Sequence, residues 1–561
     1  MVPVDPADRF DAFRALADRR GRPGDRLIAS LSEARAGTAV SAAVWAPAVA
    51  AGFGLPAAAA LGPAGYYADL AAPHGRRHVR LCTATACFAS QAGRHLDDVE
   101  RELGITAGTA SPDGETSLQA VRCLGYCYTG PAALDGDTPC SGPTLADQLA
   151  GREPSQAPEI PAADDTGDPV LLQGVVAGEP AWQVWPRMVT AGTPDEVQLE
   201  VAASGLRGRG GAGFRVAAKW EAAGRAPGTV VVVNGDEGDP GSYADRLLME
   251  TDPERVLEGL ALACFACGAR RGVVLVRSEY PRALARIRDA VEQAYAEGHF
   301  GLSVHGTDTA LDVEVVQGAG SYVAGEETAL IASLEGDRGC ARPRPPYPTQ
   351  RGLWDAPTVV NNVETLAAVP WIVSRGGEAY ARRGTPDETG TKLVCLSERF
   401  ARPGAYEVEL GTPVERIVTE LGGGLKDGSE LTVLQVGGPL GGFLAPDALD
   451  VPLTAADLDA RGASLGHAGL VAFDQRVVPE DVMRHVWQFG AAESCGACSP
   501  CRVGSRRGLE LASAGTPPGH EWERLSHVLA EASLCAFGRR IPPAVRSLAR
   551  AYGDRLAGWS P

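Results

Sequence analysis

Short, mostly apolar runs alternate with helix-like segments through the middle of the chain. Residues 230–233 have the pattern of a buried strand, and residues 273–276 and 313–316 are two further strand-like runs. Between them, Asp252-Pro253 opens one helical pattern with proline at its first position, and residues 281–298 form another. This alternation predicts an α/β domain with a mainly parallel sheet.

The flanking regions have other patterns. The N-terminal part is rich in alanine and has helical periodicity, as in Phe10-x2-Phe13-x2-Leu16 and Leu27-Ile28-x2-Leu31. A stretch rich in Pro, Glu, Asp and Ala follows residue 150 and is typical of a linker. We therefore predict a helical bundle over residues 1–75, a small domain of strands and helices over 76–150, a linker over 151–171, the α/β domain over 172–385, a domain of short strands over 386–474 and a helical domain over 475–561.

Composition narrows the class of protein. A chain of 561 residues is too long for one hydrophobic core, and its net charge of −18 argues against non-specific binding of nucleic acid. Residues 36–68 carry no charge, but they are mostly Ala and Gly interrupted by prolines, which favours buried helices over a membrane span. The first nine residues include Asp5 and Asp8 and lack the apolar core of a signal peptide. We expect a cytoplasmic protein without membrane insertion.

Four cysteines near the C-terminus have the spacing of an iron–sulfur site. Cys495, Cys498 and Cys501 form Cys-x2-Cys-x2-Cys, and Cys535 follows 34 residues after Cys501. A 4Fe–4S cluster needs several thiolates on one side and another from elsewhere. A zinc site usually takes its ligands as two separated pairs. We predict a 4Fe–4S cluster, with zinc or a scatter of buried thiols as the alternatives.

A second quartet lies in the N-terminal part. Cys82-x4-Cys87 and Cys123-x3-Cys127 are unequal pairs, and each follows an apolar, strand-like run. Neither pair has the Cys-x2-Cys spacing of a zinc knuckle or a thioredoxin-type redox motif. Two such loops suit a 2Fe–2S cluster. Disulfides are the alternative, but thiols in an intracellular protein are more often metal ligands.

A glycine-rich run precedes the first strand of the α/β domain. It reads Gly205-Leu-Arg-Gly-Arg-Gly-Gly-Ala-Gly213, and a helix-like segment follows it. Glycines let the backbone approach a phosphate, with N–H groups and a helix N-terminus facing the negative charge. The spacing is not the dinucleotide fingerprint that joins a strand directly to a helix. The run is either a phosphate site or a surface loop.

Two polar clusters follow predicted strands, and a third lies beyond them. The first is Asn-Gly-Asp-Glu-Gly-Asp-Pro-Gly over residues 234–241, the second covers 318–328 and ends in Gly-Glu-Glu-Thr, and the third is Val-Val-Asn-Asn-Val-Glu-Thr over 359–365. Ligands of α/β domains bind beyond the carboxyl ends of parallel strands. The acidic side chains can alternatively cap helices. Together the clusters indicate a polar wall around an aromatic, phosphorylated ligand.

These motifs resemble two components of respiratory complex I. From about residue 172 onwards, the glycine run, the three polar clusters and the late cysteine quartet occur in the order found in its NADH- and FMN-binding flavoprotein subunit. Residues 1–150 are similar to its thioredoxin-like 2Fe–2S subunit. The chain thus resembles a fusion of the two, as in the diaphorase (beta) subunits of soluble NAD-dependent formate dehydrogenases and NAD-reducing hydrogenases.

The resemblance implies a multidomain α/β fold. In it, an N-terminal helical bundle and a thioredoxin-like domain precede a Rossmann-like FMN/NAD domain. A ubiquitin-like β-grasp domain follows, and a C-terminal helical bundle carries the 4Fe–4S cluster. The implied cofactors are FMN, NAD, one 4Fe–4S cluster held by the late cysteine quartet and one 2Fe–2S cluster held by the early one.

The resemblance also implies roles for individual residues. Those expected at the FMN phosphate and ribityl chain are Gly208, Arg209, Gly210, Gly211 and Lys219. Those expected at the polar atoms of the flavin are Asn234, Asp236, Glu237, Asn361, Asn362 and Thr365. Those expected on the nicotinamide side are Tyr322, Glu326 and Glu327, and those expected at the adenine are Phe214 and Tyr347. Four further residues are expected to bind the cofactors: Asp239, Gly325, Val360 and Arg344.

Three of these positions depart from the commoner family pattern. Asp239 replaces a Glu, Arg344 a Lys and Tyr347 a Phe, so charge or aromaticity is kept. No side-chain acid or base is implied, because hydride passes directly between stacked rings; Glu237, Tyr322 and Glu326 would only position the cofactors.

The implied activity is that of an NAD(H)-dependent diaphorase subunit, which passes single electrons to or from a partner subunit. We expect a molybdenum- or tungsten-dependent formate dehydrogenase subunit with further iron–sulfur clusters; a hydrogenase module or a complex I arm is the alternative. A zinc-stabilised, non-catalytic scaffold is an alternative of another class.

The remaining cysteines have no predicted ligand role. Cys264-x2-Cys267 has the spacing of a metal pair but lies in an apolar helical pattern, so we expect buried thiols. Cys140, Cys340 and Cys395 are isolated in the sequence.

Overall fold

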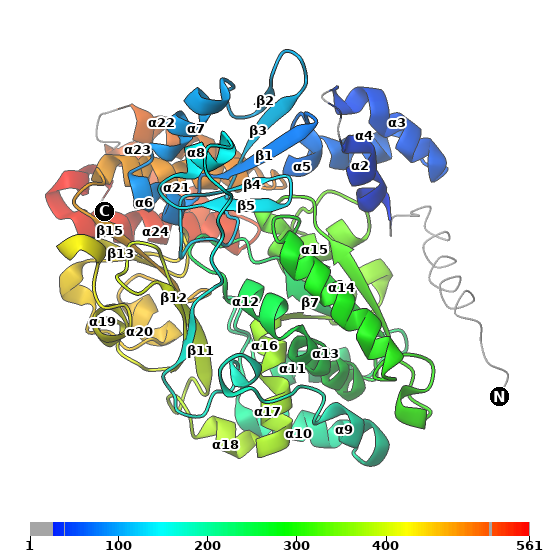
Figure 1. Cartoon of the computed structure of the whole chain (residues 1–561). Helices are drawn as coiled ribbons and strands as arrows, with labels where there is room; N and C mark the ends of the chain where they lie inside the picture. The colour runs from blue at the N-terminus through cyan, green and yellow to red at the C-terminus, as the bar shows by residue number, and fades with distance from the viewer. Residues whose placement is uncertain (1–25, 37, 39, 515–518, 560–561) are drawn as a thin grey trace.

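The computed structural model describes residues 26–36, 38, 40–514 and 519–559 (Figure 1). The periodic residues Phe10, Phe13 and Leu16 lie outside this part. The described N-terminal helices are α2 (Leu27–Arg35), α3 (Ala42–Gly52), α4 (Ala57–Ala64) and α5 (Ala68–Ala71). Leu31 and Tyr67 are fully buried among small alanines, so the uncharged stretch forms a compact helical group, as predicted.

A thioredoxin-like domain follows. Its sheet has the order β2-β3-β1-β4-β5, in which β1 and β3 are parallel and the other pairs antiparallel. The strands are β1 (Arg77–Cys82), β2 (Thr109–Ala110), β3 (Thr116–Val121), β4 (Ala132–Asp135) and β5 (Thr138–Ser141), and the helices are α6 (Thr85–Gln91), α7 (His95–Leu103) and α8 (Leu145–Leu149). Cys82 and Cys87 flank the turn from β1 into α6, and Cys123 and Cys127 lie in the loop after β3.

The middle domain has the predicted parallel sheet, in the order β10-β7-β8-β9. Its strands are β7 (Val230–Gly235), β8 (Arg271–Val276), β9 (Asp312–Gln317) and β10 (Thr358–Asn362). The helices around it are α9 (Trp185–Ala191), α10 (Pro194–Ser204), α11 (Val216–Ala223), α12 (Ala244–Thr251), α13 (Pro253–Cys267), α14 (Pro281–Ala296), α15 (Glu327–Leu334), α16 (Val363–Ala367), α17 (Val369–Arg375) and α18 (Gly377–Ala381).

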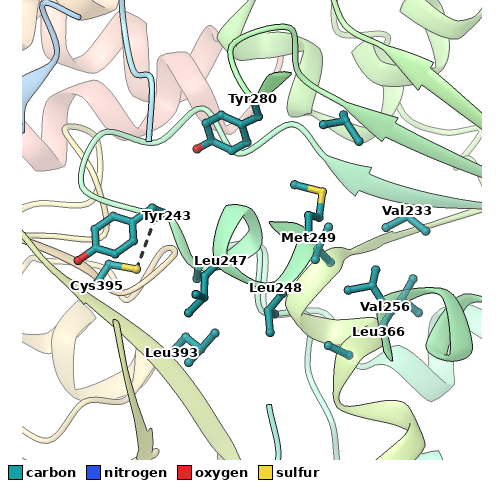
Figure 2. Close-up of a cluster of buried hydrophobic side chains, with 14 of the residues drawn as sticks. Val233, Tyr243, Leu247, Leu248, Met249, Val256, Tyr280, Leu366, Leu393 and Cys395 are labelled. Carbon is teal, nitrogen blue, oxygen red and sulfur yellow. Dashed lines mark hydrogen bonds between the residues drawn. The ribbon is translucent and has the colours of Figure 1, made fainter. Parts of the chain in front are cut away.

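Helices α12 and α13 form the centre of the core. Figure 2 shows Leu247 and Leu248 of α12 packed between Val256 of α13 and Leu393 of the next domain. Gly259 lets α13 approach α16 closely, because a Cβ there would collide with the Leu366 carbonyl oxygen. Helix α13 is almost wholly buried, so Cys264 and Cys267 are the buried thiols that the sequence predicts.

The following domain is built on a sheet in the order β14-β13-β15-β11-β12-β6. Its own strands are β11 (Thr391–Leu396), β12 (Gly404–Glu409), β13 (Leu431–Val436), β14 (Phe443–Leu444) and β15 (Gly469–Asp474), with helices α19 (Val414–Arg416) and α20 (Ala455–Ala460). The edge strand β6 (Ala162–Asp164) comes from the segment predicted as a linker and pairs in parallel with β12. The linker prediction is therefore wrong for this segment, since its backbone completes the sheet.

In the described C-terminal part, four α-helices are followed by a short 3-10 helix (Gly553–Trp559); the α-helices are α21 (Pro479–Glu493), α22 (Ser499–Ser513), α23 (Gly519–Ala532) and α24 (Ala536–Tyr552). Trp487, Trp522 and Trp559 pack against one another in their core. In Figure 1 these helices lie beside the thioredoxin-like domain. In the part of the chain that the structure describes, no helix is both long and apolar enough to cross a membrane.

Candidate functional site

The parallel sheet brings the polar clusters together beyond the carboxyl ends of its strands. Asn234, at the end of β7, donates from Nδ2 to the Gly325 carbonyl oxygen at 2.8 Å. A Cβ on Gly325 would lie 2.9 Å from the Asp236 carbonyl oxygen, and one on Gly238 would lie 2.8 Å from the Tyr322 ring. Glycine at these positions allows the two loops to pack directly against each other.

The glycine run joins the same edge of the sheet. The Arg209 backbone N–H donates to Thr365 Oγ1 at 2.8 Å. A Cβ on Gly210 would lie 3.0 Å from Asn362 Cβ, and Gly211 has a φ of 106° that side chains rarely adopt. Lys219 of α11 donates to the Val360 carbonyl oxygen at 3.1 Å. The backbone thus forms a cradle at β10 that a larger residue would fill, and this fits a phosphate with its ribityl chain.

Three polar residues of the clusters cap helices. Glu326 accepts bonds from the backbone N–H groups at the start of α15, and Asn362 accepts from the Thr365 N–H in α16. Glu237 accepts from the Asp245 and Arg246 N–H groups of α12, at 3.1 and 3.0 Å. The capping interpretation is therefore true of these side chains, and it explains how they are held at the edge of the sheet.

Some predicted contacts of the flavin are engaged elsewhere. The Arg209 guanidinium donates to Tyr380 Oη at 2.9 Å and to the Thr389 carbonyl oxygen at 2.7 Å, so it anchors the glycine run from behind. Asn361 Oδ1 accepts from Trp220 Nε1 at 2.9 Å. These two side chains support the cradle through protein contacts, and the roles at the flavin that the resemblance implies for them stay predictions.

Asp236 occupies an unusual electrostatic position. Burial raises its pKa to about 7, and the neighbouring Arg277 guanidinium opposes that effect. Arg277 also donates to Glu279 Oε1 at 2.7 Å and to the Glu237 carbonyl oxygen. A cation is therefore buried directly behind the loop that follows β7.

Two exposed aromatic side chains and an ion-pair cluster lie further out. Phe214 and Tyr347 are 55% and 52% exposed, which leaves their ring faces available for stacking. Glu327 pairs with Lys219 at 3.0 Å and with Arg344 at 2.7 Å. Arg344 also reaches Glu326 at 3.1 Å, so two carboxylates hold its guanidinium.

The late cysteine quartet lines one cavity. Cys495, Cys498, Cys501 and Cys535 contribute to its wall together with Val323, Ser494 and Phe537. Cys498 and Cys535 are the residues immediately before α22 and α24. Helix N-termini favour negative charge, and four thiolates are the soft ligands that an iron–sulfur cluster takes, so the donor set fits a 4Fe–4S cluster.

The early quartet is buried more deeply, with all four thiols at most 1% exposed. Cys123 and Cys127 have their Sγ atoms 3.7 Å apart, and the Gly125 N–H points to Cys123 Sγ at 3.3 Å. A backbone donor to a ligand sulfur is typical of iron–sulfur sites, so this donor set fits a 2Fe–2S cluster.

The loop of the early quartet packs on the middle domain. Arg246 of α12 donates to the Gly125 carbonyl oxygen at 2.9 Å, and its guanidinium lies 3.7 Å from the centre of the Tyr126 ring. A Cβ on Gly125 would lie 2.7 Å from the Tyr280 ring, and Tyr280 Oη donates to Glu237 Oε2 at 3.2 Å. Arg246 and Tyr280 belong to no recognisable motif, so no sequence signal points to them.

Cys340 is not isolated in the folded chain, contrary to the prediction. Its Sγ donates to the Cys495 carbonyl oxygen at 3.4 Å. The N-terminal helices hold this loop, because Tyr66 Oη donates to the Gly339 carbonyl oxygen at 2.7 Å. Sequence distance hid the contact, since 155 residues separate the two cysteines. Cys395 also has a partner, the Tyr243 backbone N–H at 3.4 Å (Figure 2).

Comparison with known proteins identifies the three functional regions. Residues 201–371 match the family model of the Nuo51 FMN-binding domain, and residues 13–143 match that of the thioredoxin-like 2Fe-2S ferredoxin. Residues 481–557 match the NADH-ubiquinone oxidoreductase-F iron-sulfur binding region. Both cysteine quartets thus fall in iron–sulfur regions, which speaks against the zinc scaffold.

Relatives extend the match over most of the chain. The NADP-reducing hydrogenase subunit HndC of Solidesulfovibrio fructosivorans is 39% identical over 63% of this chain and 74% of its own length. The F 2 subunit of the NADH-quinone oxidoreductase of Rhizobium meliloti (strain 1021) is 38% identical over 62% of this chain and 84% of its own. A crystal structure of NAD+-reducing NiFe-hydrogenase in the H2-reduced state superposes with a TM-score of 0.84 and 30% identity, over 96% of this chain and 94% of that one.

The fold and the sites define a flavin- and iron–sulfur-dependent oxidoreductase that acts on NAD(H), with FMN, one 2Fe–2S and one 4Fe–4S cluster as cofactors. The chain belongs to the family of the F subunits of NADH-quinone oxidoreductases, here fused to a thioredoxin-like 2Fe–2S domain.

Proposed function

We propose that this chain takes hydride from NADH at the carboxyl edge of the β10-β7-β8-β9 sheet and delivers single electrons to a partner subunit through the late cysteine quartet. One observation carries the proposal. The Tyr322 ring, at the edge of the sheet, lies 5.6 Å from the Phe537 ring, and Phe537 lines the quartet's cavity. Val323, the next residue, lines the same cavity. A single layer of side chains therefore separates the two sites.

Bound FMN would accept a hydride and release electrons singly, which no amino-acid side chain can do. In this proposal, Gly208, Gly210, Gly211 and Lys219 bind its phosphate and ribityl chain. The polar groups of Asn234 and Asp236 orient the ring, and the caps at Glu237 and Glu326 hold their loops. Phe214 and Tyr347 offer their exposed faces to adenine, since aromatic rings bind bases by stacking.

The test is a diaphorase assay of the purified protein with analysis of flavin, iron and acid-labile sulfide. We expect NADH-driven reduction of an artificial acceptor, with FMN and both clusters present. Gly210→Ala should lower FMN content and activity together, because its Cβ would press on Asn362. Retention of FMN in that variant would refute the proposed cradle.

We propose further that the partner is a molybdenum- or tungsten-dependent formate dehydrogenase subunit in the cytoplasm. The fused 2Fe–2S domain supports this, because we expect such fusions in soluble NAD-linked formate dehydrogenases as well as in hydrogenases. The relatives named above belong to hydrogenases and NADH-quinone oxidoreductases, which makes a hydrogenase module the second candidate. Co-purification from the native host, followed by assays with formate and with hydrogen, separates them.

Nucleotide choice follows from the Glu327 ion pairs. We propose a preference for NAD(H), because Glu326 and Glu327 hold Arg344 and so withdraw the guanidinium from a 2′-phosphate. Glu327→Gln should release Arg344 and improve kcat/KM for NADPH by about tenfold, the equivalent of ~1.4 kcal/mol. Glu314→Gln, at a residue that pairs with Arg271 in the same sheet, is the matched control. Equal use of NADH and NADPH by the wild type would refute the preference.

A further inference from the structure

The domain of strands β11 to β15, here named the β-grasp domain, contributes one side chain to the edge of the middle domain, here named the FMN domain. His467 lies in the turn between α20 and β15 and reaches the loop that follows β7, where its Nδ1 pairs with the Asp239 carboxylate. The same turn borders the glycine run, since a Cβ on Gly211 would lie 3.7 Å from Gly466 Cα and 4.0 Å from His467 Cε1. The imidazole thus stands between the glycine run and Asp239.

Asp239 connects this imidazole to Tyr322. Its Oδ2 pairs with His467, and its Oδ1 accepts a hydrogen bond from Tyr322 Oη. The carboxylate has little contact with solvent, because Asp239 is 8% exposed. A carboxylate with one cation and one hydroxyl partner has a fixed orientation, so it also fixes the two groups that it joins.

His467 is a cation at neutral pH. Burial lowers its pKa, but Asp239, together with Asp245 and Glu237, outweighs that effect and raises the pKa to about 9. These three carboxylates come from the loop after β7 and from α12, on the side of the turn that faces the FMN domain. The side chain itself is 17% exposed, so solvent screens the charge only partly.

We propose that His467 is a positioning residue of the flavin reaction, which places a positive charge in the wall of the FMN site and, through Asp239, fixes the Tyr322 hydroxyl. The inference rests on the proposed placement of FMN between the glycine run and Tyr322. Reduction of a flavin adds negative charge to the site, and carboxylates crowd this edge of the sheet. A nearby cation therefore favours the reduced state.

A purely structural role is the competing explanation, since the ion pair also ties the β-grasp domain to the FMN domain. That role changes stability and FMN retention, whereas it does not change the reduction potential of FMN that stays bound. The potential is therefore the measurement that separates the two explanations.

The experiment is spectroelectrochemical titration of the holoprotein. In His467→Gln, we expect the ratio of reduced to oxidised FMN at a fixed potential to fall about tenfold, which is ~30 mV for a two-electron couple. His467→Lys restores a cation and should bring the potential back towards the wild-type value. His520→Gln removes a histidine with a 95% exposed side chain and is the matched control. Kinetics should show a loss in kcat that exceeds any rise in KM for NADH.

An unchanged potential in His467→Gln with bound FMN overturns the inference. Equal shifts of the FMN reduction potential in His467→Lys and His467→Gln also overturn the inference, because the charge of the side chain would then have no effect on the potential. If His467→Gln loses its FMN, the titration is repeated with that variant saturated with added FMN, where a lowered potential supports the inference and an unchanged one overturns it. If the proposed placement of FMN is itself wrong, the result is different: Gly210→Ala, in an otherwise wild-type chain, would retain its FMN.

Discussion

The two cysteine quartets are built in opposite ways. Cys82, Cys87, Cys123 and Cys127 are buried, and their loop is locked against Arg246 and Tyr280 of the middle domain. Of the late quartet only Cys501 is buried, while Cys495, Cys498 and Cys535 are partly exposed. One site is thus enclosed within the chain, and the other lies near its surface.

The difference indicates different roles. An electron leaves a chain most readily from a site that a partner can approach, and the late quartet meets that condition. The loop of the early quartet packs on Tyr280, and Tyr280 bonds Glu237 at the edge of the sheet, so the early quartet is connected to the proposed flavin site. We infer that the late quartet is the exit and that the early one is a side site, which holds an electron of the pair.

The largest effect on turnover should come from removing a cysteine ligand of the late quartet, the inferred electron exit. Cys498→Ser should reduce partner-linked turnover to background, because serine is a hard ligand that supports an iron–sulfur cluster poorly. Cys123→Ser should abolish the paramagnetic signal of the reduced 2Fe–2S cluster and leave much of the turnover. Paramagnetic resonance with parallel turnover assays tests both variants. Complete loss of turnover in Cys123→Ser, with FMN and the 4Fe–4S cluster intact, would place the early quartet on the main path instead.

Removal of Arg246 should weaken the enclosure of the early quartet. Its side chain is 2% exposed and pairs with Glu250 at 2.7 Å, so Arg246→Ala leaves an unpaired carboxylate and should cost about 3–5 kcal/mol. We expect the 2Fe–2S absorbance to be lost at a lower temperature than in the wild type. Arg546→Ala is the control, because Arg546 of the C-terminal helices also has an aromatic neighbour, Trp522, at 5.9 Å. Equal effects of the two substitutions would contradict the special role of Arg246.

The elements of the fold could be predicted from local pattern. The strands β7, β8 and β9 are rich in Val and have helices between them, and this pattern depends only on neighbouring residues. Strand β6 could not be predicted, because three residues in a Pro-rich segment become a strand only by pairing with β12, more than 200 residues away. The formation of β6 therefore depends on tertiary pairing and not on its local sequence.

The site could be predicted where a motif carries the chemistry. Both quartets have diagnostic spacing, whereas His467, Arg246 and Cys340 act through contacts that long sequence separations conceal. A motif also does not predict every contact of its own side chains, since the Arg209 guanidinium donates to Tyr380. Spacing predicts which residues gather, and packing decides which of their atoms face the ligand.

The smaller of the two effects on stability concerns the connection between the early quartet's domain and the rest of the chain. Glu407 of β12 accepts hydrogen bonds from the backbone N–H groups of Val170, Leu171 and Leu172, at 2.9–3.0 Å. Burial raises its pKa to about 7, although these bonds and Thr391 favour the charged form. The folded state therefore binds a proton more tightly than the unfolded chain, in which the pKa keeps its ordinary value of 4.5.

Because the pKa of Glu407 is higher in the folded state than in the unfolded chain, the free energy of unfolding falls as the pH rises. The contribution of Glu407 to the free energy of unfolding is complete below the unfolded pKa of 4.5. It is lost as the pH rises through the folded pKa of about 7, and its total is on the order of 3 kcal/mol. Glu407→Gln cannot ionise, so the wild type should lose stability relative to this variant between pH 5 and pH 8. Hydrogen exchange of the amides at residues 170–172 measures this difference locally, with the amides of β7 as the internal reference. A difference that stays constant with pH would show that Glu407 remains charged throughout, and that its hydrogen bonds outweigh its burial.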